Sequence, residues 1–195
     1  MNARPQFVCA VYRTLRRAAR QDRGSQIVEF ALSLPLLVVF VVGIFDFTGA
    51  YTLKQKLANA ARESARAAAS GPANDVGNSA GVPASVFDAQ EVLVNYLDNA
   101  RINDCGLRGT APTSTDLTWT YTASGNGCPG SGVTLVINRG CVVASSGPVN
   151  VVGTCVSLQY SYQWRFNRVI TLLVPGASYG AISTLNSTAM AMNEN

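Results

Sequence analysis

The chain has 195 residues, of which 13% are charged, and its formal net charge is +4. This length suits one or two domains, and the absence of histidine removes the commonest general base and metal ligand from any proposed active site. The positive charge is confined to residues 1–24, which carry +5, while the rest of the chain carries −1. A nucleic-acid-binding role for the whole chain therefore has no electrostatic basis.

Residues 1–24 are a basic segment that differs from a secretory signal peptide. The longest apolar stretch in this segment, residues 7–12, has only six residues, and the long apolar run of the chain begins after it. Because basic flanks stay on the cytoplasmic side of a membrane, we expect this leader to lie in the cytoplasm and the remaining chain to be exported.

The apolar run Phe30–Leu53 predicts one membrane-spanning helix. The run has 24 residues with Asp46 as its only charge, and about 20 apolar residues are enough to cross the hydrocarbon core. Its thirteen Phe, Leu, Val and Ile residues up to Phe47 contribute about −4 to −8 kcal/mol to insertion, whereas Asp46 costs at most about 3 kcal/mol. The alternative is a buried helix of a soluble protein. We interpret Asp46 as a residue near the far membrane interface rather than as a proton or ion site.

The same helix is predicted to continue as far as Ser70. Small and apolar residues recur at helical spacing over this part, and the Gly-Pro pair at 71–72 provides a stop. A helix from Ser25 to Ser70 would be about 69 Å long. We expect a kink near Pro35, which removes one backbone hydrogen bond within the membrane.

Residues 71–82 are small and polar, so they predict a linker between the helix of residues 25–70 and a periplasmic domain of residues 83–195. Residues 83–103 have helical apolar periodicity. Ser85 followed by Asp88 resembles a capping box at the start of that helix.

From residue 117 the apolar period changes to two, which is typical of β-strands. We expect strands in the segments 117–123, 133–137, 141–144, 156–166 and 182–192. Asn138–Gly140 and Ser145–Pro148 are both candidate reversals between strands. We interpret the alternating aromatic residues of 158–166 as sheet core rather than as a platform for sugars or nucleic acids. The predicted fold class is α+β: a long N-terminal transmembrane helix, followed by a small periplasmic domain in which one helix packs on an antiparallel β-sheet.

Cys9 lies in the leader, and the other four cysteines lie in the exported part: Cys105, Cys128, Cys141 and Cys155. With no CxxC pair and no histidine, they favour disulfides over a zinc site, with free buried cysteines as the alternative. We expect Cys141–Cys155 with Cys105–Cys128, because residues 141 and 155 lie symmetrically about residue 148 in the second candidate reversal. The reversal at Asn138–Gly140 would instead direct Cys141 toward Cys128.

The junction before the apolar run contains Gly24 and Ser25, with Glu29 at the fifth position after the glycine. Glycine before a cut, this glutamate, and a hydrophobic helix that stays on the mature protein are the features that a prepilin peptidase recognises. Glycine keeps the backbone open enough to enter a protease site. Near the cytoplasmic edge of the bilayer, the Glu29 carboxylate would seek a cation, such as the new terminal amine of a neighbouring subunit. The alternative is an acid that only compensates the helix dipole.

Residues 23–70, about a quarter of the chain, resemble the TadE-like family of Flp/Tad pilus pseudopilins. The matching features are Gly24, VEFAL at 28–32, PLL at 35–37, GIFDF at 43–47 with Tyr51, and AARESAR at 60–66. Beyond residue 70 the match is a loose echo, formed by Ala189-Met190 and Glu194.

The resemblance implies a pseudopilin-like component of Flp/Tad (type IV-like) pilus assembly and secretion that is processed by a prepilin peptidase. The implied partners are the inner membrane, that peptidase, other pilins and pseudopilins, and the Tad assembly platform proteins. No nucleic acid, small-molecule substrate, cofactor or metal is implied. The implied location is the bacterial inner membrane, with a cytoplasmic N-terminus and a periplasmic C-terminal domain, in the pilus or at its base.

Two other classes of protein fit parts of the sequence. An unprocessed membrane-anchored adhesion or envelope-structure module would keep every feature except the cut at Gly24. An enzyme with an uncleaved anchor would need a catalytic pattern, but neither G-x-S-x-G nor a P-loop occurs. The acids Asp98, Asp104 and Asp116 of the exported domain show no recognisable pairing. We therefore expect no enzymatic activity.

Overall fold

The structure is a computed structural model that describes residues 22–72, 74–77, 81–125, 127–146, 149–166, 176 and 182–193. Most of the predicted leader therefore lies outside the described residues. The chain divides into two compact units, Met1–Phe45 and Asp46–Asn195. Each unit is described by itself below.

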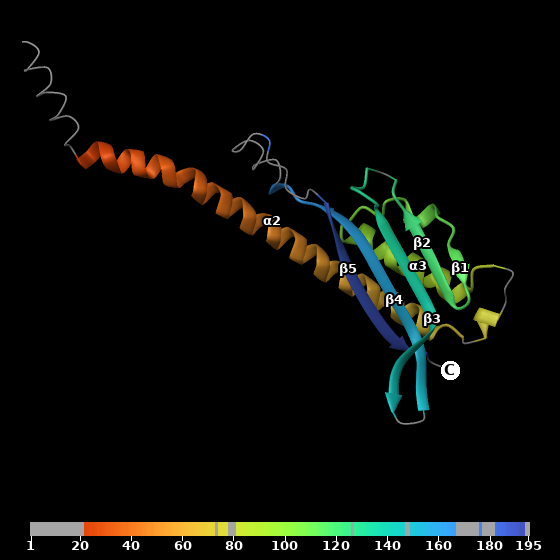
Figure 1. Cartoon of the computed structure of the whole chain (residues 1–195). Helices are drawn as coiled ribbons and strands as arrows, with labels where there is room; N and C mark the ends of the chain where they lie inside the picture. Colours follow the sequence, from red (N-terminus) through yellow and green to blue (C-terminus); the bar gives the residue numbers. More distant parts are fainter. Residues whose placement is uncertain are drawn as a thin grey trace, which may run out of the picture. The chain divides into compact units, whose positions relative to one another are not determined.

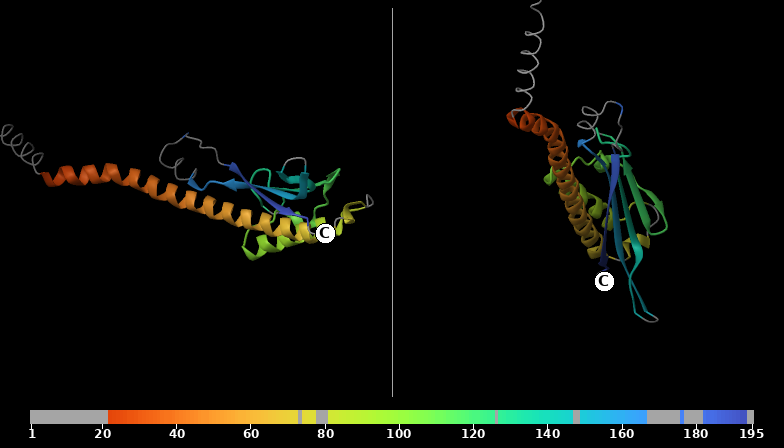
Figure 2. Two further views of the ribbon diagram at one scale, coloured as in Figure 1. Left: turned by 90° about the horizontal axis from the view of Figure 1, so that it is seen from below. Right: turned by 60° about the vertical axis from the view of Figure 1, so that its left-hand side comes forward.

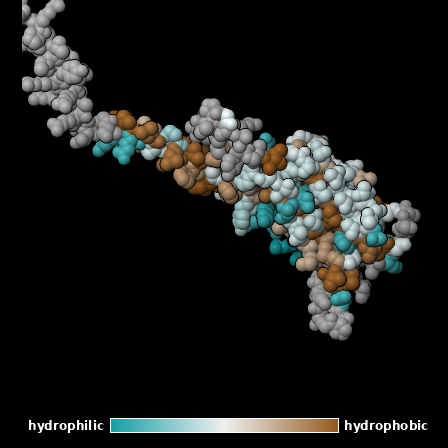
Figure 3. All heavy atoms as spheres, viewed as in Figure 1, coloured by the Kyte–Doolittle hydropathy of each residue, from teal (hydrophilic) through white to brown (hydrophobic). Residues whose placement is uncertain are grey.

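The long helix α2 extends over Asp22–Ser70 and confirms the predicted long apolar N-terminal helix. In the first unit its apolar side chains are exposed; Figure 3 shows several of them in brown. The helix is long and apolar enough to cross a membrane by length and composition. Pro35 lies inside α2, and the kink at this residue stays a prediction.

The second unit begins with the remainder of α2, which enters the core of the folded domain. Its buried residues in the core are Leu57, Ala60, Ala61, Ala65 and Ala68. Small side chains let the helix approach its neighbour closely, and the buried Ser64 Oγ donates a hydrogen bond to the carbonyl oxygen of Ala89 at 2.8 Å. This part of the predicted membrane helix is therefore also a core helix of the domain.

The predicted helix of residues 83–103 is confirmed as α3, Ala84–Asn99. The capping box was wrong: Ser85 lies inside the helix, and the N-cap residue Pro83 forms no side-chain cap. The Ser85 N–H instead donates to Asp75 Oδ2 at 2.9 Å. Asp75 begins the short 3₁₀ helix η1, Asp75–Gly77, so the cap comes from ten residues upstream, within the predicted linker.

Five antiparallel strands follow, in the spatial order β1-β2-β3-β4-β5 (Figure 1). They are β1 Thr113–Thr115, β2 Thr118–Ala123, β3 Val133–Ser146, β4 Val149–Gln163 and β5 Ile182–Met192, with the 3₁₀ helix η2, Leu107–Gly109, before β1. In the second unit, α3 and the end of α2 lie on one face of this sheet (Figure 2). The predicted α+β class is confirmed, and so is the final strand at 182–192.

The candidate hairpin at Asn138–Gly140 was wrong, because β3 continues through these residues with a shift in register. Arg139 lies at this shift and is buried, with 3% of the residue exposed. Its backbone N–H donates to the Leu117 carbonyl oxygen. A Cβ on Gly140 would lie 2.6 Å from Leu117 Cδ1. The nearest atoms to this Cβ all belong to the flexible Leu117 side chain, and the strand makes no turn at Gly140. The chain reverses after β3, where Ser146 pairs with Val149.

Arg139 connects this irregular part of β3 to the end of the long helix. Its Nη2 atom donates to the carbonyl oxygens of Gly71 and Pro72, each at 3.3 Å, and lies 3.8 Å from Asp75 Oδ1. Burial lowers the pKa of Arg139, and the nearby Asp75 charge acts in the opposite direction. The predicted linker is therefore held against the sheet by a buried ion pair.

The structure forms both disulfides in the pairing expected from the cysteine positions. Their Cα–Cα distances are 5.5 Å for Cys105–Cys128 and 5.9 Å for Cys141–Cys155. The second pair is not directly opposed in the ladder: Cys141 pairs with Gly153, because the register shift in β3 intervenes.

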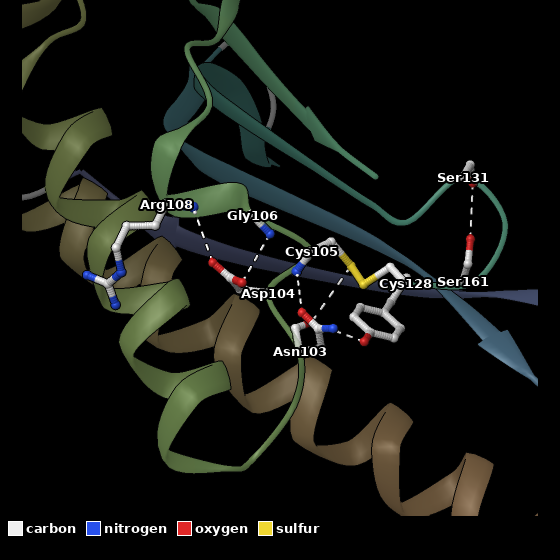
Figure 4. The surroundings of a disulfide bond; sticks show 9 residues. Asn103, Asp104, Cys105, Gly106, Arg108, Cys128, Ser131 and Ser161 are labelled. Carbon is white, nitrogen blue, oxygen red and sulfur yellow. Dashed lines mark hydrogen bonds between the residues drawn. A yellow bond between two sulfur atoms is a disulfide. The ribbon is translucent and has the colours of Figure 1, made fainter. Parts of the chain in front are cut away.

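Figure 4 shows the first disulfide beside Asn103, at the end of the loop that follows α3. The Asn103 side-chain oxygen Oδ1 accepts a hydrogen bond from the Cys105 N–H at 2.9 Å. The backbone carbonyl oxygen of Asn103 accepts one from Tyr160 Oη at 3.0 Å. The Cys105 carbonyl oxygen accepts from the Gly125 N–H. This disulfide therefore fastens the helix end to the loop before β3.

We predict that peptide mapping under non-reducing conditions recovers the linkages 105–128 and 141–155. Replacing Cys105 and Cys128 together by Ala should lower the free energy of unfolding, because the bridge closes a loop with a sequence separation of 23, worth on the order of 3 kcal/mol in the chain-entropy model. A 128–141 linkage would contradict the β3–β4 register described above.

Candidate functional site

The predicted cleavage junction lies within the first turns of α2. The backbone of Gly24 and Ser25 is helical; the side chains of residues 22–25 lie outside the described residues. A glycine in a helix interior destabilises it by roughly 0.5–1 kcal/mol relative to alanine. Gly24 therefore makes local unwinding, which a protease needs, less costly at this point than an alanine would.

Glu29 follows Ser25 by one helical turn, a rise of about 6 Å. Its side chain is exposed, and among the described residues no ion pair includes it. A carboxylate in this position is accessible to a cation from outside the described part of the chain. The predicted pairing of Glu29 with a neighbouring terminal amine stays a prediction.

Asp46 begins the second unit. Among the acids of α2 whose side chains the structure describes, it is the most buried, with 6% of the residue exposed. Tyr162 Oη donates to Asp46 Oδ1 at 3.0 Å, and the Phe166 N–H donates to Asp46 Oδ2 at 2.8 Å. Both donors come from the end of β4 and the residues that follow it. Sequence analysis placed Asp46 near a membrane interface but gave it no partner.

Tyr162, which donates to this carboxylate, belongs to a series of aromatic contacts. The Phe47 and Trp164 ring centroids lie 5.3 Å apart, and the Tyr162 and Trp164 rings meet edge to face at 5.1 Å. Trp164 Nε1 donates to Ser183 Oγ at 2.6 Å, which adds the start of β5 to the cluster. A Cβ on Gly49 would lie 3.2 Å from Tyr162 Oη, so this glycine leaves room for the phenol.

The cluster keeps Tyr162 as a hydrogen-bond donor. Burial raises the pKa of Tyr162, and its hydrogen bond to Asp46 raises this pKa further. The phenol therefore stays protonated at neutral pH and can donate to the carboxylate. This arrangement supplies no positive charge to Asp46. It provides hydrogen-bond donors to the carboxylate where α2 contacts the end of β4.

The apolar run divides into an exposed part and a packed part. Large apolar side chains of α2 are exposed in the first unit and at Phe47 and Tyr51, whereas Leu53, the predicted end of the membrane run, packs against the domain core. The 20 residues from Gln26 to Phe45 rise about 30 Å, which matches the thickness of a hydrocarbon core.

Neither a metal cluster nor a dinucleotide site is found among the described residues. Among the described residues, no group of three or more His, Cys, Asp or Glu could hold a metal ion. Asp98 pairs with Arg108 at 2.8 Å, and Asp104 accepts a hydrogen bond from the Gly106 N–H. The glycines at 125, 127 and 130 have the spacing of a dinucleotide fingerprint, but they connect two antiparallel strands rather than a strand and a helix.

Comparison with known proteins gives one match. Residues 24–66 match the family model described as TadE-like protein, which confirms the resemblance seen in the sequence. No curated protein and no solved structure matches the chain significantly. The matched segment begins at Gly24, contains both Glu29 and Asp46, and ends within α2.

We predict that the Asp46 interaction contributes to the stability of the second unit. Tyr162→Phe should lower the free energy of unfolding by about 1.5–3 kcal/mol, the usual value of a hydrogen bond to a charged group. Tyr51→Phe is the matched control, because Tyr51 is an exposed tyrosine of α2, the helix that carries Asp46. Denaturant unfolding of the detergent-solubilised protein provides the measurement. If Tyr162→Phe costs as much in an Asp46→Ala background as in the unmodified chain, the two residues are not coupled.

Proposed function

We propose that this protein is a pseudopilin-like component of Flp/Tad pilus assembly and secretion, anchored by a single membrane span. The observation that carries the proposal is the TadE-like match over residues 24–66, which coincides with the helix that leads from the predicted junction into the folded domain. A pilus-type subunit needs this continuity, because its helix is both the anchor and a part of the fold.

The proposed topology places the N-terminus in the cytoplasm and the second unit in the periplasm. Six arginines before residue 25 favour retention of that end. Two disulfides in the second unit fit an oxidising compartment. The protein would then lie in a bacterial inner membrane, in the pilus or at its base.

Processing is the next part of the proposal. A prepilin peptidase would cut between Gly24 and Ser25, leaving a chain that begins with an α-amino group and the hydrophobic helix. Glu29 would pair with the terminal amine of a neighbouring pilin or pseudopilin, an interaction that is favourable where water is scarce. The Tad assembly platform would then bind the processed subunits.

The competing function is an unprocessed, membrane-anchored adhesion or envelope-structure module. Both functions are compatible with the anchor, the disulfides and the Asp46 cluster. They require different mature N-termini, so the cleavage state distinguishes them directly.

We predict that the mature protein begins at Ser25, as read by N-terminal sequencing or mass spectrometry of membrane-extracted protein. Gly24→Leu should block cleavage by placing a branched side chain where the protease needs an open backbone. Gly43→Leu is the matched control in the same helix, since a Cβ at Gly43 meets nothing within 4 Å. A mature N-terminus at Met1, or one beyond residue 50, would refute the pseudopilin function.

We also predict that Glu29→Ala leaves cleavage largely intact and impairs pilus assembly. If Glu29 only compensates the helix dipole, Glu29→Gln should be nearly neutral, because such effects are worth about 0.3–1 kcal/mol. Glu63→Gln is the matched control, since Glu63 is an exposed acid of the same helix that pairs with Arg66 at 3.3 Å. Piliation would be scored on sheared surface fractions, and normal piliation of Glu29→Gln cells would argue against the assembly role.

A further inference from the structure

The Asp46 cluster begins at the boundary between the two units. Phe45 is the last residue of the first unit, and Asp46 is the first residue of the second. If the apolar segment is embedded in lipid, as the proposed function requires, chain connectivity alone puts the residues next to Asp46 at the lipid surface. The inference below therefore rests on the proposed membrane anchor.

Several large side chains of the second unit are exposed around this point. Phe47 and Tyr51 on α2 are 71% and 65% exposed, and Ile182 at the start of β5 is 48% exposed. Trp164 is half-buried and Arg165 is exposed, both directly after β4. We call these five residues the juxtamembrane face.

Three separate segments build this face, and contacts hold them together. The end of β4 and the start of β5 lie at the same end of the sheet, where Gln163 pairs with Ile182 (Figure 1). The Phe47–Trp164 ring contact joins them to α2. The hydrogen bonds of Asp46 fix the same end of β4 to the helix. The face is thus a built surface rather than a set of scattered apolar residues.

The depth of the face fits the headgroup layer of a bilayer. This layer is roughly 5–8 Å thick on each side of the hydrocarbon core. Along the helix, Phe47 and Tyr51 lie at most about 9 Å beyond Phe45. Both side chains therefore fall within reach of the headgroups when the anchor ends at Phe45.

The chemistry of the face also fits a lipid interface. Trp and Tyr are enriched at membrane interfaces because their rings have an apolar body and a polar end. Arg165 supplies a cation for a lipid phosphate. Over residues 46–54, 160–166 and 182–193 the only acid is Asp46, and its carboxylate is buried and hydrogen-bonded. In the sequence, residues 167–181 have Arg168 as their only charged residue.

We propose that the juxtamembrane face is a second membrane contact, through which the folded domain rests on the headgroups of an anionic bilayer. Trp164 lies among the headgroups, and Arg165 binds a lipid phosphate. A neighbouring protein is the competing occupant of this face. Lipid is favoured because the face begins two residues after the anchor ends and carries an interfacial aromatic set with an exposed cation and no free acid.

The two tryptophans of the chain provide a test with an internal control. Trp119 is buried in the sheet core, at 5% exposure, while Trp164 belongs to the face. The full chain is reconstituted in vesicles of phosphatidylcholine and phosphatidylglycerol, with a lipid that carries a quencher near its headgroup. Trp164 emission should be lost to this quencher and protected from aqueous iodide, whereas Trp119 emission should be retained.

Trp164→Phe isolates the Trp119 signal, and Trp119→Phe isolates that of Trp164. Should Trp119→Phe fail to fold, the difference between the unmodified chain and Trp164→Phe gives the same information. Arg165→Glu should weaken the lipid quenching of Trp164 in anionic vesicles, and Arg62→Glu, which changes an exposed arginine of α2 distant in sequence from the face, should not. Quenching of Trp164 by iodide but not by lipid would overturn the proposal.

Two further outcomes separate the possible failures. If the protein does not float with the vesicles, the proposed membrane anchor fails. If it floats but Trp164 is not quenched by lipid, only the second contact fails. In cells, a photoreactive phenylalanine in place of Phe47 should form lipid adducts, with exposed Phe87 of α3 as the matched control position. Adducts of position 47 with another protein would assign the face to a protein neighbour and overturn the proposal.

Discussion

A carboxylate held between a helix and the end of a sheet fixes the start of the second unit of this protein. Next to hydrocarbon, an unpaired charge is expensive, and Asp46 avoids that cost because Tyr162 and the backbone of Phe166 solvate it. These donors are available only when the sheet has formed, and the sheet is held against the helix by the same hydrogen bonds. Further along, Leu57 and the alanines of α2 extend the contact into the core. The buried Arg139 ties down the last turn of the helix through Gly71 and Pro72. The helix is thereby fixed to the sheet at both ends of its path through the domain.

Much of this architecture could be predicted from local periodicity. The long apolar run, the period of 3.6 over α3 and the period of two over β2, β4 and β5 each indicate an element without reference to the rest of the chain. The strand β3 could not be read this way, since Asn-Arg-Gly at 138–140 has the composition of a turn. The burial of Arg139 and its hydrogen bonds to the end of α2 favour an irregular strand over a turn. The cap of α3 escaped prediction for the same reason: Asp75 reaches Ser85 through a tertiary arrangement, not through a motif.

In the candidate site, too, residues close in sequence could be predicted, whereas partners that only the fold brings together could not. Gly24, Ser25 and Glu29 lie within six residues of one another, so their spacing is visible in the sequence. The partners of Asp46 are 116 and 120 residues away along the chain. No local sequence pattern predicts a pairing over that distance. A single acid in an apolar run instead indicates a residue near the membrane interface. The aromatic alternation at 158–166 was understood as sheet core, which holds for Tyr160, whereas Tyr162 and Trp164 extend past the core to the helix.

The dual use of α2 has a consequence for how the domain could be released from a cell. Both disulfides lie between residues 105 and 155, so neither connects the long helix covalently to the rest of the fold. A protease that nicked α2 between Leu57 and Ser70 would leave the buried Leu57 on the membrane stump and remove it from the shed fragment. A fragment that keeps both Asp46 and Leu57 requires a cut before Asp46, in the stretch that lipid would shield. A cut in α2 after Leu57 therefore releases a domain that lacks part of its own core.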